Sequence, residues 1–183
     1  GNVAFNLNKV EGIEKITIED INFVKHLGFR IKLISESFLI DNMICSSTKP
    51  KLIPLDKPMA NVDGALNAIN VETDQLENLY LEGEGAGGLA TASSILSDIF
   101  EISNNSKFTS IGYNINDLKK YQKFDSSNLE SKFYLRIRVK DQPGVLSKIT
   151  TYLNDSNISV EKILQSPDKK ENNIPILIIT HKI

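Results

Sequence analysis

The residues best suited to chemistry form a glycine-rich run, Gly-Glu-Gly-Ala-Gly-Gly, at positions 83–88. A long helix is expected directly after it, because apolar residues between 91 and 100 recur on one helical face. Glycines let a backbone approach a ligand closely and adopt positive φ, and a helix start presents free amides and about half a positive charge. The pattern fits a turn that binds an anionic ligand. The alternative is a tight strand-to-helix turn that serves packing alone.

A second strand-to-helix turn, Asp-Gln-Pro-Gly-Val-Leu, occupies residues 141–146. Gly144 opens space in this turn, and the free amides at the start of the following helix can accept a carboxylate. Asn157 and Ile158 stand at the start of the next expected strand, and we expect them to line the same pocket. The alternative is a Pro-Gly turn in which Asp141 serves only as a cap.

These two turns require elements that position them, and residues 1–102 are expected to form an α+β domain with an antiparallel-rich sheet. Thr17, followed three positions later by Asp20, predicts a helix start, and Gly28 predicts its end. The elements that follow are a strand at 29–39, a polar turn at 45–51, a helix or turn at 64–68, and an antiparallel hairpin of strands at 69–73 and 76–81.

Residues 103–130 are polar and are interpreted as a linker with one short ordered piece. Residues 131–183 then predict the order strand, helix, strand, strand. The strands are expected at 133–139, 158–164 and 174–180, with a polar turn at 167–173. A complete ferredoxin-like unit needs one further helix and strand. We therefore expect the second domain to be truncated at its C-terminal end.

Composition excludes several classes of protein. The chain has 183 residues, 40% of them hydrophobic, and 21 basic against 23 acidic side chains, for a net charge of −2. This near-neutral balance gives no indication of binding to nucleic acid or to a membrane surface, and no apolar run reaches the ~18 residues of a membrane span. The single cysteine, Cys45, excludes an internal disulfide, and two distant histidines, His26 and His181, argue against a metal site.

Several motifs of the first domain resemble the homoserine dehydrogenase family. The sequence reads Val-Glu-Gly-Ile at 10–13 and Leu-Gly-Phe-Arg-Ile-Lys-Leu-Ile at 27–34, then Pro-Lys-Leu-Ile-Pro at 50–54 and Pro-Met-Ala-Asn-Val at 58–62. The densest similarity is Gly-Glu-Gly-Ala-Gly-Gly-Leu-Ala-Thr-Ala-Ser at 83–93. Residues 133–180 resemble the ACT domain, a ferredoxin-like regulatory module that follows the substrate domain in many bacterial forms.

The resemblance implies the NAD(P)-dependent interconversion of L-aspartate 4-semialdehyde and L-homoserine on the route to threonine, methionine and isoleucine. It implies a cytoplasmic, homo-oligomeric enzyme that uses NADP or NAD. The family's dinucleotide-binding half, its catalytic lysine and the partner carboxylate fall upstream of Gly1, so we expect an inactive C-terminal fragment with no catalytic residue of its own. Where the family often has His-Pro, this chain has Lys57-Pro58.

The resemblance also assigns roles to the two turns. In the family the glycine-rich loop returns to the nucleotide domain, which implies that Gly85, Ala86 and Gly87 contact the cofactor. In ACT domains the second turn binds an amino acid at a domain–domain interface, which implies an effector site at Asp141, Gly144, Val145, Asn157 and Ile158, with threonine as the natural effector. The alternative function is a stand-alone amino-acid-sensing regulatory protein without catalysis.

Overall fold

A computed structural model describes residues 13–104, 116, 118–125, 128–165 and 173–183. Half of the expected linker at 103–130 and nearly all of the expected turn at 167–173 lie outside these residues. The chain divides into two compact units, Gly1–Phe124 and Asp125–Ile183. Both units combine helices with mainly antiparallel sheets, so the expected α+β class is confirmed. Each unit is described below by itself.

The first helix, α1 (Ile18–His26), begins and ends where the sequence predicts. The side-chain oxygen of Thr17 accepts a hydrogen bond from the Asp20 amide (3.4 Å), and the Asp20 carboxylate accepts one from the Thr17 amide (2.8 Å). This reciprocal capping box satisfies two amides that the helix itself leaves free. Gly28, at φ 87°, then turns the chain out of the helix.

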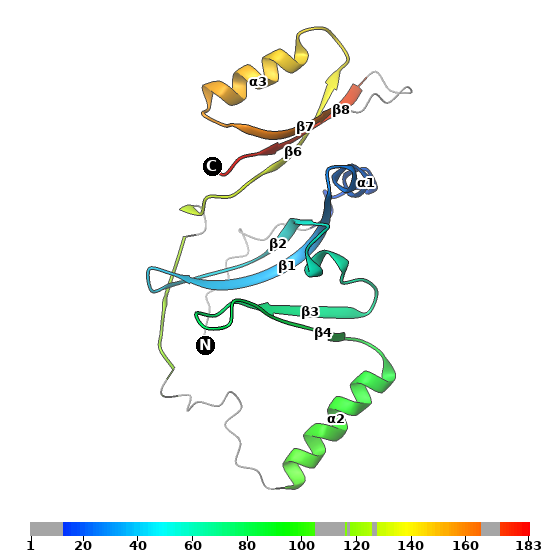
Figure 1. Ribbon diagram of the computed structural model, residues 1–183, viewed down its shortest axis with the longest axis vertical. Helices are drawn as coiled ribbons and strands as arrows, with labels where there is room; N and C mark the ends of the chain where they lie inside the picture. Colours follow the sequence, from blue (N-terminus) through cyan, green and yellow to red (C-terminus); the bar gives the residue numbers. More distant parts are fainter. Residues whose placement is uncertain (1–12, 105–115, 117, 126–127, 166–172) are drawn as a thin grey trace. The chain divides into compact units, whose positions relative to one another are not determined.

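A long antiparallel hairpin dominates the first unit (Figure 1). Strand β1 (Phe29–Ile40) pairs with β2 (Met43–Pro54) through twelve residues of each strand. Asp41 and Asn42 both have positive φ (47° and 60°), as a tight two-residue hairpin turn requires. A short third strand, β5 (Gln122–Lys123), pairs with β2 in parallel.

The prediction of a polar turn at 45–51 is wrong, because these residues lie inside β2. Their polar side chains find partners across the hairpin. The hydroxyl groups of Ser35 and Thr48 lie 2.9 Å apart, and Ser47 donates a hydrogen bond of 2.9 Å to Glu36. Cross-strand pairs of this kind stabilise a strand whose composition alone indicates a loop.

Three further elements lead to the glycine run. A short 3-10 helix, η2 (Pro58–Asn61), is followed by a second hairpin of β3 (Leu66–Val71) and β4 (Leu79–Glu84). The expected hairpin is confirmed, but residues 66–68, expected as a helix or turn, belong to β3. The last long element of the unit, α2 (Gly88–Ser103), begins directly after the glycine run.

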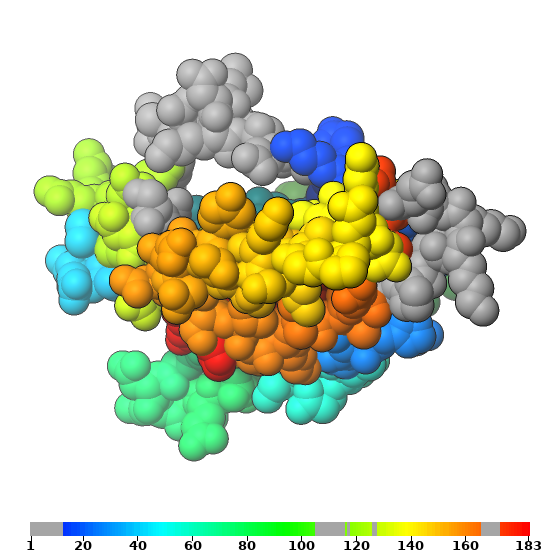
Figure 2. Space-filling view, turned by 90° about the horizontal axis from the view of Figure 1, so that it is seen from above, coloured from blue at the N-terminus to red at the C-terminus, as the bar shows by residue number. Residues whose placement is uncertain are grey.

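The second unit has the expected order of strand, helix, strand, strand. Its elements are β6 (Tyr134–Lys140), α3 (Val145–Asp155), β7 (Val160–Gln165) and β8 (Asn173–Thr180). The antiparallel sheet has the order β6-β8-β7, and α3 runs along one of its faces (Figure 1). The central strand β8 is buried from Ile174 to Thr180 and forms the core of the unit. Figure 2 looks onto the outer surface of α3, drawn in yellow and orange.

Candidate functional site: two glycine turns at helix starts

The glycine run spans the junction between β4 and α2. Its first two residues, Gly83 and Glu84, belong to the strand, so the turn itself is Gly85-Ala86-Gly87. The amide of Gly85 donates a hydrogen bond of 2.9 Å to the carbonyl of Ala65, which anchors the start of the turn. The carbonyl of Gly87 accepts the first helical hydrogen bond, 3.0 Å from the Thr91 amide. The turn is thereby tied at both ends.

The two glycines of the turn have different surroundings. A β-carbon at Gly85 would lie 1.7 Å from Nδ2 of Asn67, so position 85 faces a neighbouring side chain. A β-carbon at Gly87 would meet no described atom within 4 Å, and Gly87 has φ 122°, a conformation that L-residues rarely adopt. The turn is therefore closed on the Asn67 side and open at Gly87.

The open side of the turn has the polarity that an anion requires. Gly87 is the N-cap of α2 and provides no side-chain cap, so the first amides of the helix have no capping oxygen from that residue. The helix dipole places about half a positive charge at the same point. A backbone that leaves open space and presents helix-start amides can approach an anionic ligand closely.

Two carboxylates stand on the strand that leads into the turn. Tyr80 donates a hydrogen bond of 2.5 Å to the Glu82 carboxylate, and this bond raises the pKa of the Tyr80 hydroxyl to about 12. Glu84 follows on the same face of β4. Sequence reasoning missed this group, although the alternation of Tyr80, Glu82 and Glu84 along one strand was visible in the sequence.

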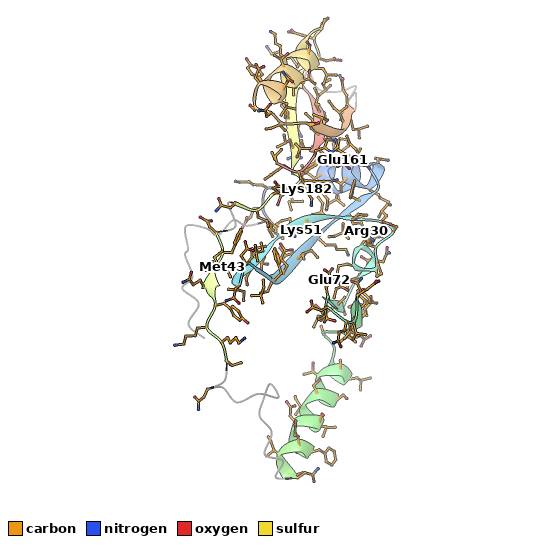
Figure 3. All side chains as sticks on the ribbon, turned by 60° about the vertical axis from the view of Figure 1, so that its left-hand side comes forward. Arg30, Met43, Lys51, Glu72, Glu161 and Lys182 are labelled. Atoms are coloured by element: carbon orange, nitrogen blue, oxygen red, sulfur yellow. The ribbon has the colours of Figure 1, made fainter. Side chains whose placement is uncertain are left out.

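The helix that follows the turn exposes its apolar side chains. Leu89 is 90% exposed, and Phe100 is 65% exposed. Others of the same helix are more than half exposed: Ile95, Leu96, Ile99 and Ile102. Figure 3 shows the side chains of α2 as sticks along the helix. Apolar surface of this extent on one helix indicates a face that packs against another structure in an assembled protein.

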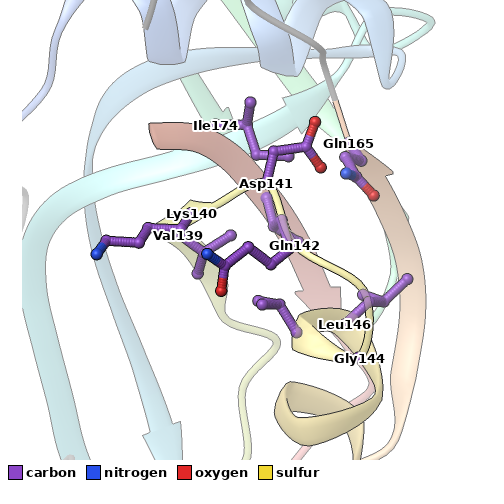
Figure 4. A pocket seen from close by; sticks show the side chains of 10 residues that line it. Val139, Lys140, Asp141, Gln142, Gly144, Leu146, Gln165 and Ile174 are labelled. Carbon is purple, nitrogen blue, oxygen red and sulfur yellow. The ribbon is translucent and has the colours of Figure 1, made fainter. Parts of the chain in front are cut away.

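The second turn lies beside a small pocket in the second unit (Figure 4). The pocket has a volume of about 80 Å³, and its lining includes Asp141, Gly144 and Val145. Gly144 is the N-cap of α3 and has φ 85°, a left-handed conformation that favours glycine. Residues of the lining that the sequence analysis did not single out are Val139, Lys140, Gln165, Ile174 and Ile176. They come from the ends of β6, β7 and β8, which sequence periodicity alone does not bring together.

Asn157 and Ile158 are not part of this pocket. They follow the C-terminal end of α3, where Asn157 has φ 56° and the Ile158 amide donates a 2.8 Å hydrogen bond to the Leu153 carbonyl. The 11 residues of α3 separate them from Gly144, which at 1.5 Å per residue is about 16 Å. Within one chain, the structure therefore joins Asp141, Gly144 and Val145 and leaves Asn157 and Ile158 at the other end of the helix.

Cys45 and His181 have no described neighbours that would make them part of a metal site. Cys45 is a buried free thiol. His181 Nδ1 lies 4.0 Å from the Glu161 carboxylate, which also pairs with Lys132. Within the described parts of the chain, no three His, Cys, Asp or Glu side chains group in a way that could hold a metal ion. None of the described helices is both long and apolar enough to cross a membrane.

Comparison with known proteins gives matches to both units. A family model described as homoserine dehydrogenase matches residues 1–100, and one described as ACT domain matches residues 133–183. A homoserine dehydrogenase from Pseudomonas aeruginosa is 31% identical over 99% of this chain, and one from Bacillus subtilis is 35% identical over 98%. The chain spans only 43% and 42% of the lengths of these relatives.

Solved structures give the same result. The crystal structure of a homoserine dehydrogenase from Thiobacillus denitrificans matches 94% of this chain with a TM-score of 0.76 and 31% identity, over 40% of its own length. A Staphylococcus aureus homoserine dehydrogenase, at 23% identity and a TM-score of 0.64, shares the fold. The sequence and the fold of this chain thus both match homoserine dehydrogenases.

Proposed function

Because this chain belongs to the homoserine dehydrogenase family, we propose that the complete protein interconverts L-aspartate 4-semialdehyde and L-homoserine with NADP or NAD. The observation that carries this proposal is the turn at Gly85–Gly87. It lies within the region matched by the family model and is open at Gly87. When bound, the nicotinamide cofactor supplies or accepts the hydride.

The contribution of this chain is to approach and orient the cofactor. The backbone of Gly85, Ala86 and Gly87 comes close to the bound dinucleotide, and the first amides of α2 face its negative charge. The apolar side chains of α2 pack against the part of the complete protein that holds the rest of the dinucleotide. The groups that transfer the proton of the homoserine hydroxyl are supplied outside this chain, in keeping with the family resemblance.

In this proposal, the second unit has the regulatory role. Threonine binds in the pocket beside Asp141, Gly144 and Val145, with its carboxylate toward the first amides of α3. Asn157 and Ile158 lie too far away in the same chain, so they contribute from a second copy of the unit across a domain–domain interface. The protein is accordingly a homo-oligomer, and its setting is the cytoplasm, where threonine, methionine and isoleucine are made.

The test is homoserine-dependent reduction of NADP and NAD by the complete product of the reading frame that contains this chain. We expect activity with at least one of the two cofactors. The purified 183-residue chain, assayed in parallel, is expected to be inactive because it lacks a dinucleotide-binding unit. Failure of the complete product with both cofactors would overturn the proposed activity, and activity of the 183-residue chain would overturn the assignment of catalysis to residues outside it.

A further inference from the structure

Two basic side chains of β1 hold the loop that precedes β3. Arg30 Nη1 donates hydrogen bonds to the Ala60 carbonyl (3.1 Å) and to the Asp63 carboxylate (2.7 Å). Lys32 Nζ donates to the other oxygen of Asp63 (3.0 Å) and to the Val62 carbonyl. Arg30 and Lys32 are two positions apart, so both side chains project from the same face of β1. Figure 3 labels Arg30 in this position.

This arrangement, which we call the Asp63 clamp, consists of Arg30, Lys32 and Asp63. Its ionic part alone is weak, because Asp63 is 65% exposed and exposed ion pairs contribute little to stability. However, the same two cations also satisfy backbone carbonyls of the loop, one of them at the fully buried residue Ala60. The clamp therefore fixes the path of the loop more than it adds to the stability of the unit.

The far end of the same loop touches the glycine turn. The Asp63 carbonyl accepts a 3.3 Å hydrogen bond from the Leu66 amide, so the chain from 63 to 66 forms a tight turn, with Gly64 at φ 66°. Within this turn, the Ala65 carbonyl accepts the hydrogen bond from the Gly85 amide. A continuous path thus leads from β1 through Asp63 and Ala65 to the start of the glycine turn.

We propose that Asp63 is a positioning residue: held by Arg30 and Lys32, it fixes the Ala65 carbonyl and so sets the position of the glycine turn at Gly85–Gly87. The effect of this positioning on catalysis rests on the proposed function, in which the glycine turn contacts the cofactor. The link between clamp and turn is a property of the chain itself and can be measured without any cofactor.

The test is amide hydrogen exchange, measured by NMR on the 183-residue chain and its Asp63→Asn variant. Removal of the charge breaks the bidentate pairing, so we expect the Gly85 amide to exchange at least about tenfold faster. The amides paired between β1 and β2 report whether the sheet stays folded, and we expect their exchange to be unchanged. Asp63→Glu keeps a carboxylate and should restore most of the protection at Gly85.

The matched control is Asp56→Asn, which removes an exposed carboxylate that forms no ion pair with the other described residues and should leave exchange at Gly85 unchanged. Exchange at Gly85 that stays within about twofold in Asp63→Asn would overturn the proposal. Loss of protection throughout β1 and β2 would overturn it as well, since the clamp would then stabilise the sheet and not position the turn.

A second measurement separates this inference from the proposed function. In the complete protein, Asp63→Asn is expected to raise the KM for the nicotinamide cofactor several-fold and to change kcat less. If exchange at Gly85 rises while this KM stays constant, the positioning role of Asp63 is supported and the proposed contact between the turn and the cofactor is overturned. If the KM rises with no change at Gly85, the positioning role fails and the cofactor role stands.

Discussion

Gly85 and Asn67 face each other so closely that a β-carbon at position 85 would lie 1.7 Å from Asn67 Nδ2 and 2.7 Å from its Cγ. Asn67 in turn donates a 3.4 Å hydrogen bond to Ala65, the residue whose carbonyl anchors Gly85. A side chain at position 85 would therefore have to displace Asn67, whereas at position 87 the preference for glycine comes from a positive φ.

This contact predicts the outcome of Gly85→Ala. The new methyl group has to displace the Asn67 side chain, so we expect the amides of the β3–β4 hairpin to lose protection against hydrogen exchange by an amount corresponding to about 1 kcal/mol. The double variant Asn67→Ala with Gly85→Ala removes the clash and should recover most of this loss. Two single effects that simply add would show that the two residues are not coupled.

The proposed threonine site beside Gly144 predicts a change in regulation without a change in catalysis. Val145→Phe places a larger side chain in a pocket of about 80 Å³, so we expect the half-inhibitory threonine concentration of the complete protein to rise at least about tenfold. The matched control is Tyr152→Ala, because Tyr152 lies on α3 and is 73% exposed. Deletion of residues 131–183 should remove inhibition altogether. Inhibition that persists after the deletion would place the effector site elsewhere.

The ion pair between Glu36 and Lys51 predicts how the long hairpin responds to pH. Burial alone raises the pKa of Glu36, but hydrogen bonds from Lys51 and Ser47, and the nearby lysine charges, outweigh burial and hold it below its ordinary value. Because the folded pKa is lowered, the stabilisation is complete above the unfolded pKa of about 4.3 and is lost as the pH falls through the folded value.

Glu36→Gln should therefore flatten the fall in stability of the hairpin between about pH 6 and pH 3. The exchange of the amides paired between β1 and β2, followed as a function of pH and corrected for the intrinsic rate, measures this dependence. The control is Glu77→Gln, since Glu77 is an exposed carboxylate that forms no ion pair with the other described residues. An unchanged pH profile in Glu36→Gln would contradict the account of this ion pair.

The sequence predicts a helix or strand well where neighbouring residues determine its ends or its periodicity. Thr17, Asp20 and Gly28 marked α1 correctly because capping depends on neighbouring residues only. Alternation identified β1 and β6. By contrast, the polar side chains of residues 45–51 predict a turn. They are compatible with a strand because hydroxyl-bearing partners in β1 stand opposite them.

The same distinction holds for the candidate sites. The glycine turn could be located from composition, because glycines before an amphipathic helix are a local pattern. The Asp63 clamp could not, since Arg30 and Asp63 are 33 positions apart and meet only through the tertiary fold. The separation of Asn157 from Gly144 was not predicted either. The sequence places Asn157 near the start of a strand, but its distance from Gly144 follows from the length of α3.

The most direct test of the central claim is the KM for the nicotinamide cofactor in the complete protein carrying Gly87→Val, with Gly83→Ala in β4 as the control. Gly87 has φ 122° and open space beside it, so a branched side chain both strains the turn and occupies the surface that approaches the cofactor. We expect the KM to rise more than tenfold in Gly87→Val, or about 1.4 kcal/mol, and to be unchanged in Gly83→Ala. A KM unchanged in Gly87→Val would contradict the cofactor role of the glycine turn.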